Sequence, residues 1–233
     1  QLKGLSETFL KNHPPGPNGL VKLTTDYPDY FPVIEFCEDR SVAKALNKLF
    51  DSRAADKNMK TLSKVLELRR EKAKLLGYKS WAAFAIEPRM AKTPEAVQKF
   101  LETAAKEVKA PAQKELAEFR AEWEAMPGNK KGAALPTYDR VFLESRLRKK
   151  KYAFDTQELS KYFEVNAVTT GMLGIFERMF GVKFEENKTA KKWHEDVRVL
   201  DVTEGGNKVG RIYLDLHPRA GKFKHAAMFE IRP

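Results

Sequence analysis

The fold class is decided by one stretch of the sequence, which reads Val197-Arg198-Val199-Leu200-Asp201-Val202-Thr203-Glu204-Gly205-Gly206-Asn207-Lys208-Val209-Gly210-Arg211-Ile212-Tyr213-Leu214-Asp215-Leu216. Apolar and polar residues alternate on both sides of the Gly-Gly pair, as in strands that bury one face. Adjacent glycines suit the tight turn of a hairpin. After a second turn at 218–222, a third extended piece runs from His225 to Ile231. The C-terminal part therefore predicts a small antiparallel sheet.

Upstream of this sheet, apolar residues recur at helical spacing. The clearest helix begins at Thr93-Pro94, because threonine is a good N-cap and proline suits the first helical position. It continues to about Met126, and Pro111 should kink or divide it. Further helical patterns lie at 41–50, 62–76, 138–147 and 165–180. Other helix ends are marked by capping or stop residues, namely Ser41, Gly77, Ser80, Asp155 and Gly181.

A short hairpin is also expected near the N-terminus. It would pair Leu20–Thr25 with Pro32–Phe36 across the turn Tyr27-Pro28-Asp29-Tyr30. The predicted fold is thus mainly α with a small antiparallel β-sheet near the C-terminus, an α+β arrangement. Four segments follow along the chain: 1–127 is helical and contains the short hairpin, 128–133 is a loop, 134–182 is helical, and 183–233 is the antiparallel β segment.

The net charge of +11 raises the question of nucleic-acid binding, because clustered cations displace counterions from phosphates. Most lysines and arginines alternate with glutamates along helices, which is typical of solvated faces. The one dense basic run, Arg146–Lys151, either contacts a polyanion or forms a solvated helix end. A basic helical module that binds nucleic acid, or a helical protein-interaction module, is therefore the alternative function. No apolar stretch approaches the roughly 20 residues of a membrane-spanning helix.

The lone cysteine and the first residues bear on compartment and processing. Cys37 excludes an intrachain disulfide and is typical of a reducing compartment, so we expect the cytoplasm, with the periplasm as the alternative. The chain begins Gln1-Leu2-Lys3-Gly4, with no initiator methionine and no signal-peptide pattern. This beginning indicates an excised or trimmed segment.

Catalytic and metal-binding motifs are hard to find. The four histidines are His13, His194, His217 and His225, and no two of them have the i, i+4 spacing that points both imidazoles of one helix at a zinc ion. His217 and His225 flank a turn but have no evident third ligand. Cys37 has no histidine near it in sequence, and no nucleophile motif occurs. We therefore predict no metal site and no catalytic residue in this segment.

Several stretches resemble one family of zinc peptidases, that of thimet oligopeptidase, oligopeptidase A and dipeptidyl carboxypeptidase. They occur in the family's order, and the last is the strongest: Leu68–Tyr78, Met90–Val97, Tyr152–Asp155, Tyr162-Phe163, Gly181-Val182, Trp193–Arg198 and Tyr213–Ala227. Two departures are that His217 stands where a tyrosine is common and that Lys222-Phe223-Lys224 precedes the His-Ala-Ala triplet. Both bear on substrate preference.

The resemblance implies a parent with two largely helical lobes around a channel, which cleaves short peptides through zinc-activated water. In that family the zinc helix, with its His-Glu-x-x-His motif, lies beyond the position that matches Pro233. We therefore expect this chain to be a fragment that binds no zinc and is inactive by itself. Its partners would be short peptides, with neither nucleic acid nor membrane, and zinc would be the cofactor of the parent alone.

The piece His225-Ala226-Ala227-Met228 is the candidate substrate-binding segment. Extended substrates commonly add themselves as a strand to an exposed sheet edge. Small side chains such as those of Ala226 and Ala227 let another backbone approach closely. The alternative is an ordinary internal or edge strand, and a bare edge could also pair with another copy of the chain.

Overall fold

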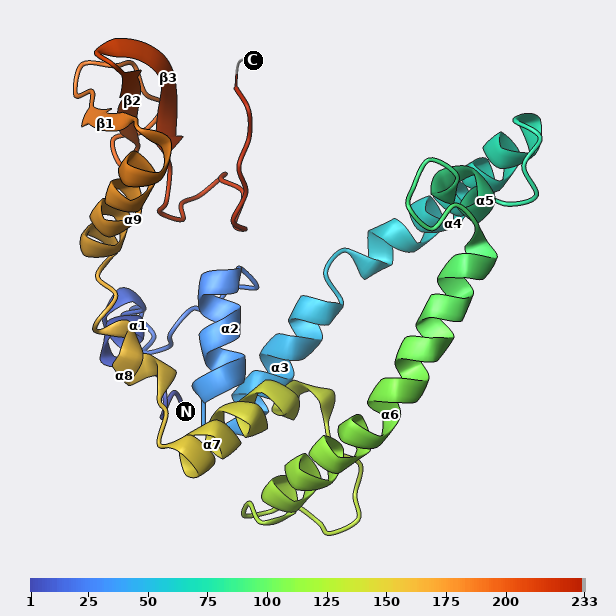
Figure 1. Cartoon of the computed structure of the whole chain (residues 1–233). Helices are drawn as coiled ribbons and strands as arrows, with labels where there is room; N and C mark the ends of the chain where they lie inside the picture. The colour runs from blue at the N-terminus through green and yellow to red at the C-terminus, as the bar shows by residue number, and fades with distance from the viewer. Residues whose placement is uncertain (232–233) are drawn as a thin grey trace. The chain divides into compact units, whose positions relative to one another are not determined.

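The structure is a computed structural model that describes residues 1–231 (Figure 1). Its elements, in chain order, are α1 (Glu7–Asn12), α2 (Tyr27–Phe36), α3 (Arg40–Asp51), α4 (Ala55–Leu75), α5 (Trp81–Ile86), α6 (Pro94–Glu124), the 3-10 helix η1 (Thr137–Asp139), α7 (Arg140–Tyr152), α8 (Thr156–Ser160), α9 (Val165–Phe180), β1 (Lys183–Glu186), β2 (Arg198–Glu204) and β3 (Asn207–Leu214). The predicted class, mainly α with a small antiparallel sheet near the C-terminus, is confirmed.

The chain divides into two compact units, one of residues 1–25 and 29–151 and one of residues 26–28 with those from 152 onward. The boundary after Lys151 lies inside the segment 134–182 that the sequence assigned to one helical stretch. None of the described helices combines the length and the apolar character needed to cross a bilayer.

The first unit has its core where α1, α2 and α3 meet. Apolar side chains at helical spacing on each helix turn toward this centre, and the buried set is Leu5, Phe9, Tyr30, Val33, Ile34, Cys37, Ala43 and Leu46. Val141 of α7 packs against the same cluster. Burial of such side chains contributes about 1.5–3 kcal/mol each. The three short helices are therefore held by their shared core.

The predicted N-terminal hairpin is wrong, because Tyr27–Phe36 forms α2 and Leu20–Thr25 forms no strand. Pro28 lies in the first turn of α2, where a missing N–H costs nothing. The Asp29 carboxylate accepts hydrogen bonds from the backbone N–H of Thr24 (2.8 Å) and from its hydroxyl (2.6 Å). Residues 30, 33, 34 and 37 then face the core together, which a strand would not allow.

A buried polar cluster joins α3, α6 and η1. The Arg40 Nε donates to Asp139 Oδ1 (2.7 Å), and the Trp123 indole N–H donates to Asp139 Oδ2 (2.9 Å). Arg40 also donates to the backbone oxygens of Ile34, Cys37 and Tyr138, and its guanidinium lies 4.2 Å from the centre of the Phe142 ring. Burying a charge is costly unless it is paired and hydrogen-bonded, and both conditions are met here.

Helices α4, α5 and α6 up to Glu118 form a helical arm. Within it α5 contacts both α4 and α6, and of the residues of α4 only Ala73 is buried. Thr93 caps α6 as predicted, and its hydroxyl accepts from the N–H of Ala96 (3.2 Å). The helix then passes through Pro111 without being divided. The expected cap of α3 is displaced from Ser41 to Asp39, whose longer side chain accepts from the Ser41 N–H.

The second unit contains α8, α9 and a sheet of strand order β1-β2-β3, antiparallel throughout. The β2–β3 hairpin is confirmed, and Gly205 and Gly206 at its turn both have positive φ (55° and 84°). Gly181, with φ 69°, ends α9. Strand β1 was not predicted, because Lys-Phe-Glu-Glu has one apolar residue and resembles a solvated loop.

The third predicted strand is wrong where it can be checked, because residues 225–231 form no strand; the rest of the predicted β segment, residues 232–233, lies outside the described residues. The backbone oxygens of Asp215 and His217 accept hydrogen bonds from the Lys222 ammonium. These bonds hold a compact turn after β3, so the chain leaves the sheet without folding back along it.

Candidate functional site

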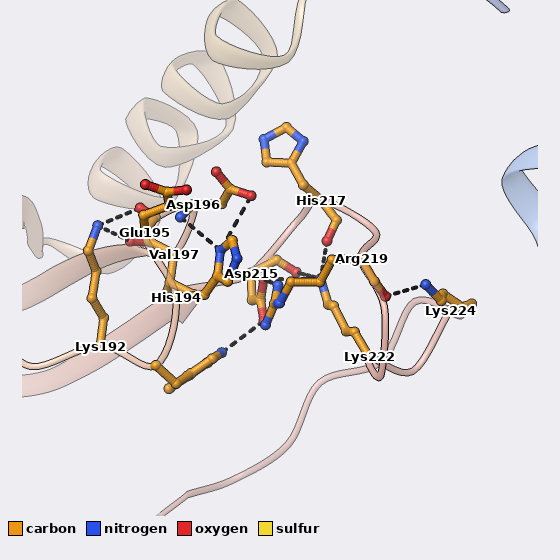
Figure 2. A network of polar contacts seen from close by, with 11 residues as sticks. Lys192, His194, Glu195, Asp196, Val197, Asp215, His217, Arg219, Lys222 and Lys224 are labelled. Atoms are coloured by element: carbon orange, nitrogen blue, oxygen red, sulfur yellow. Dashed lines mark hydrogen bonds and ion pairs between the residues drawn. The ribbon is translucent and has the colours of Figure 1, made fainter. Parts of the chain in front are cut away.

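Two polar loops meet at one end of the sheet, and the chain enters the candidate substrate segment from there (Figure 2). Arg198 pairs with Leu214, so the loop 187–197 before β2 and the loop 215–224 after β3 lie at the same end. The indole N–H of Trp193 donates to Asp215 Oδ2 (3.0 Å), and the Trp193 ring stacks on Tyr213 with ring centres 5.1 Å apart. The hydrogen bond joins the two loops, and the ring contact joins the first loop to β3.

Asp215 is the centre of the second loop. Arg219 binds its carboxylate with two nitrogens, Nη1 to Oδ1 (2.7 Å) and Nη2 to Oδ2 (2.9 Å), and the Lys222 Nζ lies 3.0 Å from Oδ1. The hydrogen bonds from Arg219 and then Trp193, with a smaller one from Lys222, hold the pKa of Asp215 far below its ordinary value. Asp215 is therefore a carboxylate at neutral pH.

Lys222 closes the loop from inside. Its ammonium donates to the backbone oxygens of Asp215 and His217, each at 2.7 Å, as well as to the Asp215 carboxylate. An ammonium has three N–H groups, and all three have acceptors here. Lys224 also donates to the backbone oxygen of Arg219. The turn 215–224 is thus held together by lysine side chains that donate hydrogen bonds to its backbone oxygens.

The first loop repeats this construction. The Lys192 Nζ donates to the backbone oxygens of Glu195 (2.6 Å) and Val197 (3.2 Å). At the start of the loop the side-chain oxygen of Asn187 accepts from the N–H groups of Thr189 and Ala190. Both loops are therefore ordered by side chains that bind nearby backbone. Sequence reasoning missed this, although a carboxylate at a strand end followed by cations four and seven residues later is a usable signal.

The histidines are dispersed. His194 Nδ1 accepts from the backbone N–H of Asp196 (3.2 Å), and His225 Nδ1 lies 2.9 Å from the oxygen of Ala226. In the other unit His13 lies 3.0 Å from Asp29 Oδ1 and stacks on Phe9. Among residues 1–231, no three His, Cys, Asp or Glu side chains come close enough together to hold a metal ion. The zinc that the family resemblance implies therefore has no fitting ligand set in the described part of the chain.

The candidate substrate segment 225–228 follows directly on the turn. All four of its residues are exposed, with Met228 at 89%. In the described structure no backbone hydrogen bond engages the N–H groups of Ala226 and Ala227. Nothing in the structure tests whether the segment binds peptides, so this role stays a prediction.

The basic run on α7 contacts glutamates of α6. Arg146 and Lys150 both pair with Glu122 (3.1 and 3.2 Å), and Lys151 pairs with Glu118 (2.5 Å). Burial opposes the ionisation of Glu122, but the hydrogen bonds from Lys150 and Arg146 outweigh it and lower its pKa. This cationic face is thus partly neutralised by the protein itself.

Residues 33–233 match the model of peptidase family M3. The chain is 30% identical to oligopeptidase A of Escherichia coli over 86% of its length and 32% identical to saccharolysin of Saccharomyces cerevisiae over 98%. It is 34% identical to the mitochondrial intermediate peptidase of Yarrowia lipolytica over 77%. The matches cover 30%, 34% and 24% of these relatives, so the chain spans about a third of their length or less. The match over most of its length shows that this chain belongs to peptidase family M3.

Proposed function

We propose that this chain is part of a zinc-dependent oligopeptidase that hydrolyses short peptides. The observation that carries the proposal is the family match over residues 33–233, together with relatives named as oligopeptidases. The chain would supply helical structure and the sheet end that contacts the substrate. The zinc ligands would come from polypeptide outside these 233 residues, since the described residues contain no fitting set.

We assign peptide binding to the segment His225–Met228. Its exposure, the small side chains of Ala226 and Ala227, and their unengaged N–H groups support this role. The carbonyl groups of a peptide aligned beside the segment would accept hydrogen bonds from these N–H groups, and the peptide's own N–H groups would donate to the segment, as when a strand is added to a sheet edge. The segment forms no strand in the free chain, and in this proposal it becomes one when the peptide binds.

The test compares this chain with a longer one that is extended toward the full length of its relatives. Zinc content is measured by mass spectrometry of the purified proteins, and cleavage is followed with an internally quenched fluorescent peptide. We expect the longer chain to bind zinc and to cleave the peptide, and this chain to do neither. A longer chain that folds but neither binds zinc nor cleaves would overturn the proposal, as would cleavage by this chain alone.

We propose peptides rather than nucleic acid as the partner. The pairing of Arg146, Lys150 and Lys151 with glutamates supports this, because a cation already neutralised releases fewer counterions from phosphates. A gel shift with single- and double-stranded DNA over a salt series is the test. Binding at physiological salt that is lost in a Lys150→Glu variant would contradict the proposal.

A further inference from the structure

Four hydrogen bonds from three side chains converge on one carboxylate between β3 and the candidate peptide-binding segment. Asp215 binds Trp193 of the preceding loop and, within its own loop, Arg219 and Lys222. Figure 2 shows Arg219 and Lys222 beside Asp215. The side chains of Asp215, Arg219 and Lys222 are 16%, 22% and 20% exposed, so the cluster is well shielded for a surface turn.

We propose that Asp215 is a positioning residue for peptide binding, which fixes the turn 215–224 so that the segment 225–228 leaves the sheet in one direction. This inference rests on the proposed function, because it assumes that the segment receives the peptide. Asp215 does not itself touch the peptide in this account. It acts through Arg219, which binds both of its oxygens, and through Lys222, which it holds against the backbone of the turn.

The electrostatics explain why one carboxylate matters so much. Arg219 and Lys222 both contact Asp215 Oδ1, so the two cations are close neighbours. Without the carboxylate they repel each other, and the turn relaxes as they separate into water. Lys222 then releases the oxygens of Asp215 and His217, which are the bonds that keep the turn closed. Loss of one charge therefore loosens the turn.

A loosened turn weakens binding through entropy. A segment that samples many directions must be ordered when a peptide binds, and the entropic cost of this ordering makes binding weaker. The peptide backbone is neutral, so removal of the Asp215 charge changes affinity through order and not through a lost charge contact.

Asp201 provides a matched control on the same sheet. Its carboxylate also accepts from an arginine (Arg211, 2.6 Å), a lysine (Lys208, 2.7 Å) and an amide (Asn187, 2.7 Å), and its side chain is 16% exposed, as in Asp215. It lies within β2, away from the turn. The variant Asp201→Asn removes the same charge from a similar cluster without touching residues 215–224.

The experiment compares the wild-type chain with the variants Asp215→Asn and Asp201→Asn. The probe is a short acetylated and amidated peptide of alanine and phenylalanine, titrated while the amide resonances of 225–228 are followed by NMR. We expect the wild type to bind through these residues, Asp215→Asn to bind about tenfold more weakly, which is 1.4 kcal/mol, and Asp201→Asn to bind as the wild type does. Hydrogen exchange at 216–224 should accelerate only in Asp215→Asn.

The outcomes separate this inference from the proposed function. If the wild type shows no shifts at 225–228, the peptide-binding role of the segment fails, and the role of Asp215 fails with it. If the wild type binds and Asp215→Asn binds equally well, only the inference is overturned. Equal weakening in Asp201→Asn would also overturn it, because a general loss of sheet stability would then explain the effect. Should Asp215→Asn not fold, Arg219→Gln removes the two-nitrogen contact and is expected to weaken binding in the same way.

Discussion

Two aspartates of the first unit hold together segments that are distant in the sequence. The Asp139 carboxylate accepts hydrogen bonds from Arg40 and Trp123 in a buried cluster. The Asp29 carboxylate accepts from Thr24 and contacts His13 where α2 begins. Sequence patterns do not show these contacts. Arg40 and Asp139, for example, are 99 residues apart, and no local motif predicts that they pair. The contributions of the two carboxylates can be separated by substitution.

The first prediction concerns Asp139→Asn. It leaves the largely buried Arg40 guanidinium without its charged partner, and breaking such a pair costs about 3–5 kcal/mol. The free energy of unfolding, measured by urea denaturation and the helical circular dichroism signal, should fall by that amount. Glu144→Gln is the control, since Glu144 pairs with Arg148 at the surface and such pairs contribute about 0–1 kcal/mol. Similar losses in the two variants would refute a special role for Asp139.

The second prediction concerns acid stability. Burial opposes the ionisation of Asp29, but the hydrogen bonds from Thr24 and His13 outweigh it and lower the pKa of Asp29. A carboxyl whose pKa is lower in the folded state stabilises above its unfolded pKa, about 3.9, and this contribution is lost as the pH falls further. The stability difference between wild type and Asp29→Asn should therefore shrink as the pH falls below about pH 4. Urea unfolding of both proteins across this range is the measurement, and a difference that does not change with pH would contradict it.

At the scale of elements, local signals predicted the helix ends and long-range contacts decided the rest. Thr93, Ser80, Asp155 and Gly181 cap or end helices as expected, because capping depends on a few neighbouring residues. The segment 27–36 was misassigned because its two prolines resemble turn residues, while its helical form depends on burial against α1 and α3. Likewise, β1 depends on its pairing with β2 and not on its own pattern. The clustering of Arg219 and Lys222 around Asp215 needed the folded loop to be seen.

A third prediction uses two glycines of α9. Gly171 lies inside the helix, where an added Cβ would meet nothing within 4 Å, whereas Gly181 ends the helix at φ 69°. Gly171→Ala should stabilise α9 by about 0.5–1 kcal/mol, because alanine loses less backbone entropy than glycine. Gly181→Ala should destabilise it by about 1 kcal/mol, since left-handed backbone strains a residue with a Cβ. Thermal unfolding followed by circular dichroism measures both, and a shift of the same sign in the two variants would be the contrary result.

At the scale of the whole molecule, the chain exposes a large apolar surface on α9. Of α9 only Thr169 is buried, and seven large apolar side chains are 37–66% exposed: Val165, Val168, Met172, Ile175, Phe176, Met179 and Phe180. A helix with apolar residues on most of its faces is normally buried. This fits a chain that spans about a third of the length of oligopeptidase A.

A fourth prediction follows for the chain in solution. Exposed apolar helices promote association, so sedimentation velocity should show concentration-dependent self-association. Met179→Lys should reduce it, because it places a charge on the apolar surface near the C-terminal end of α9, where the helix dipole tolerates a cation. Thr170→Lys is the control, as it adds the same charge to the same helix at a polar position. Association that both variants reduce equally would point to net charge as the cause.

The buried pair Arg40–Asp139 has one more consequence, for how this architecture can vary among relatives. The two residues are 99 positions apart, and the whole helical arm lies between them. The chain thus leaves the core after α3, forms the arm, and returns to the core at η1. Bringing the two ends of a longer segment together costs little extra entropy, about 0.6 kcal/mol of free energy for each doubling of the segment's length. The arm can therefore change in length at little cost while α3 and η1 keep their contact.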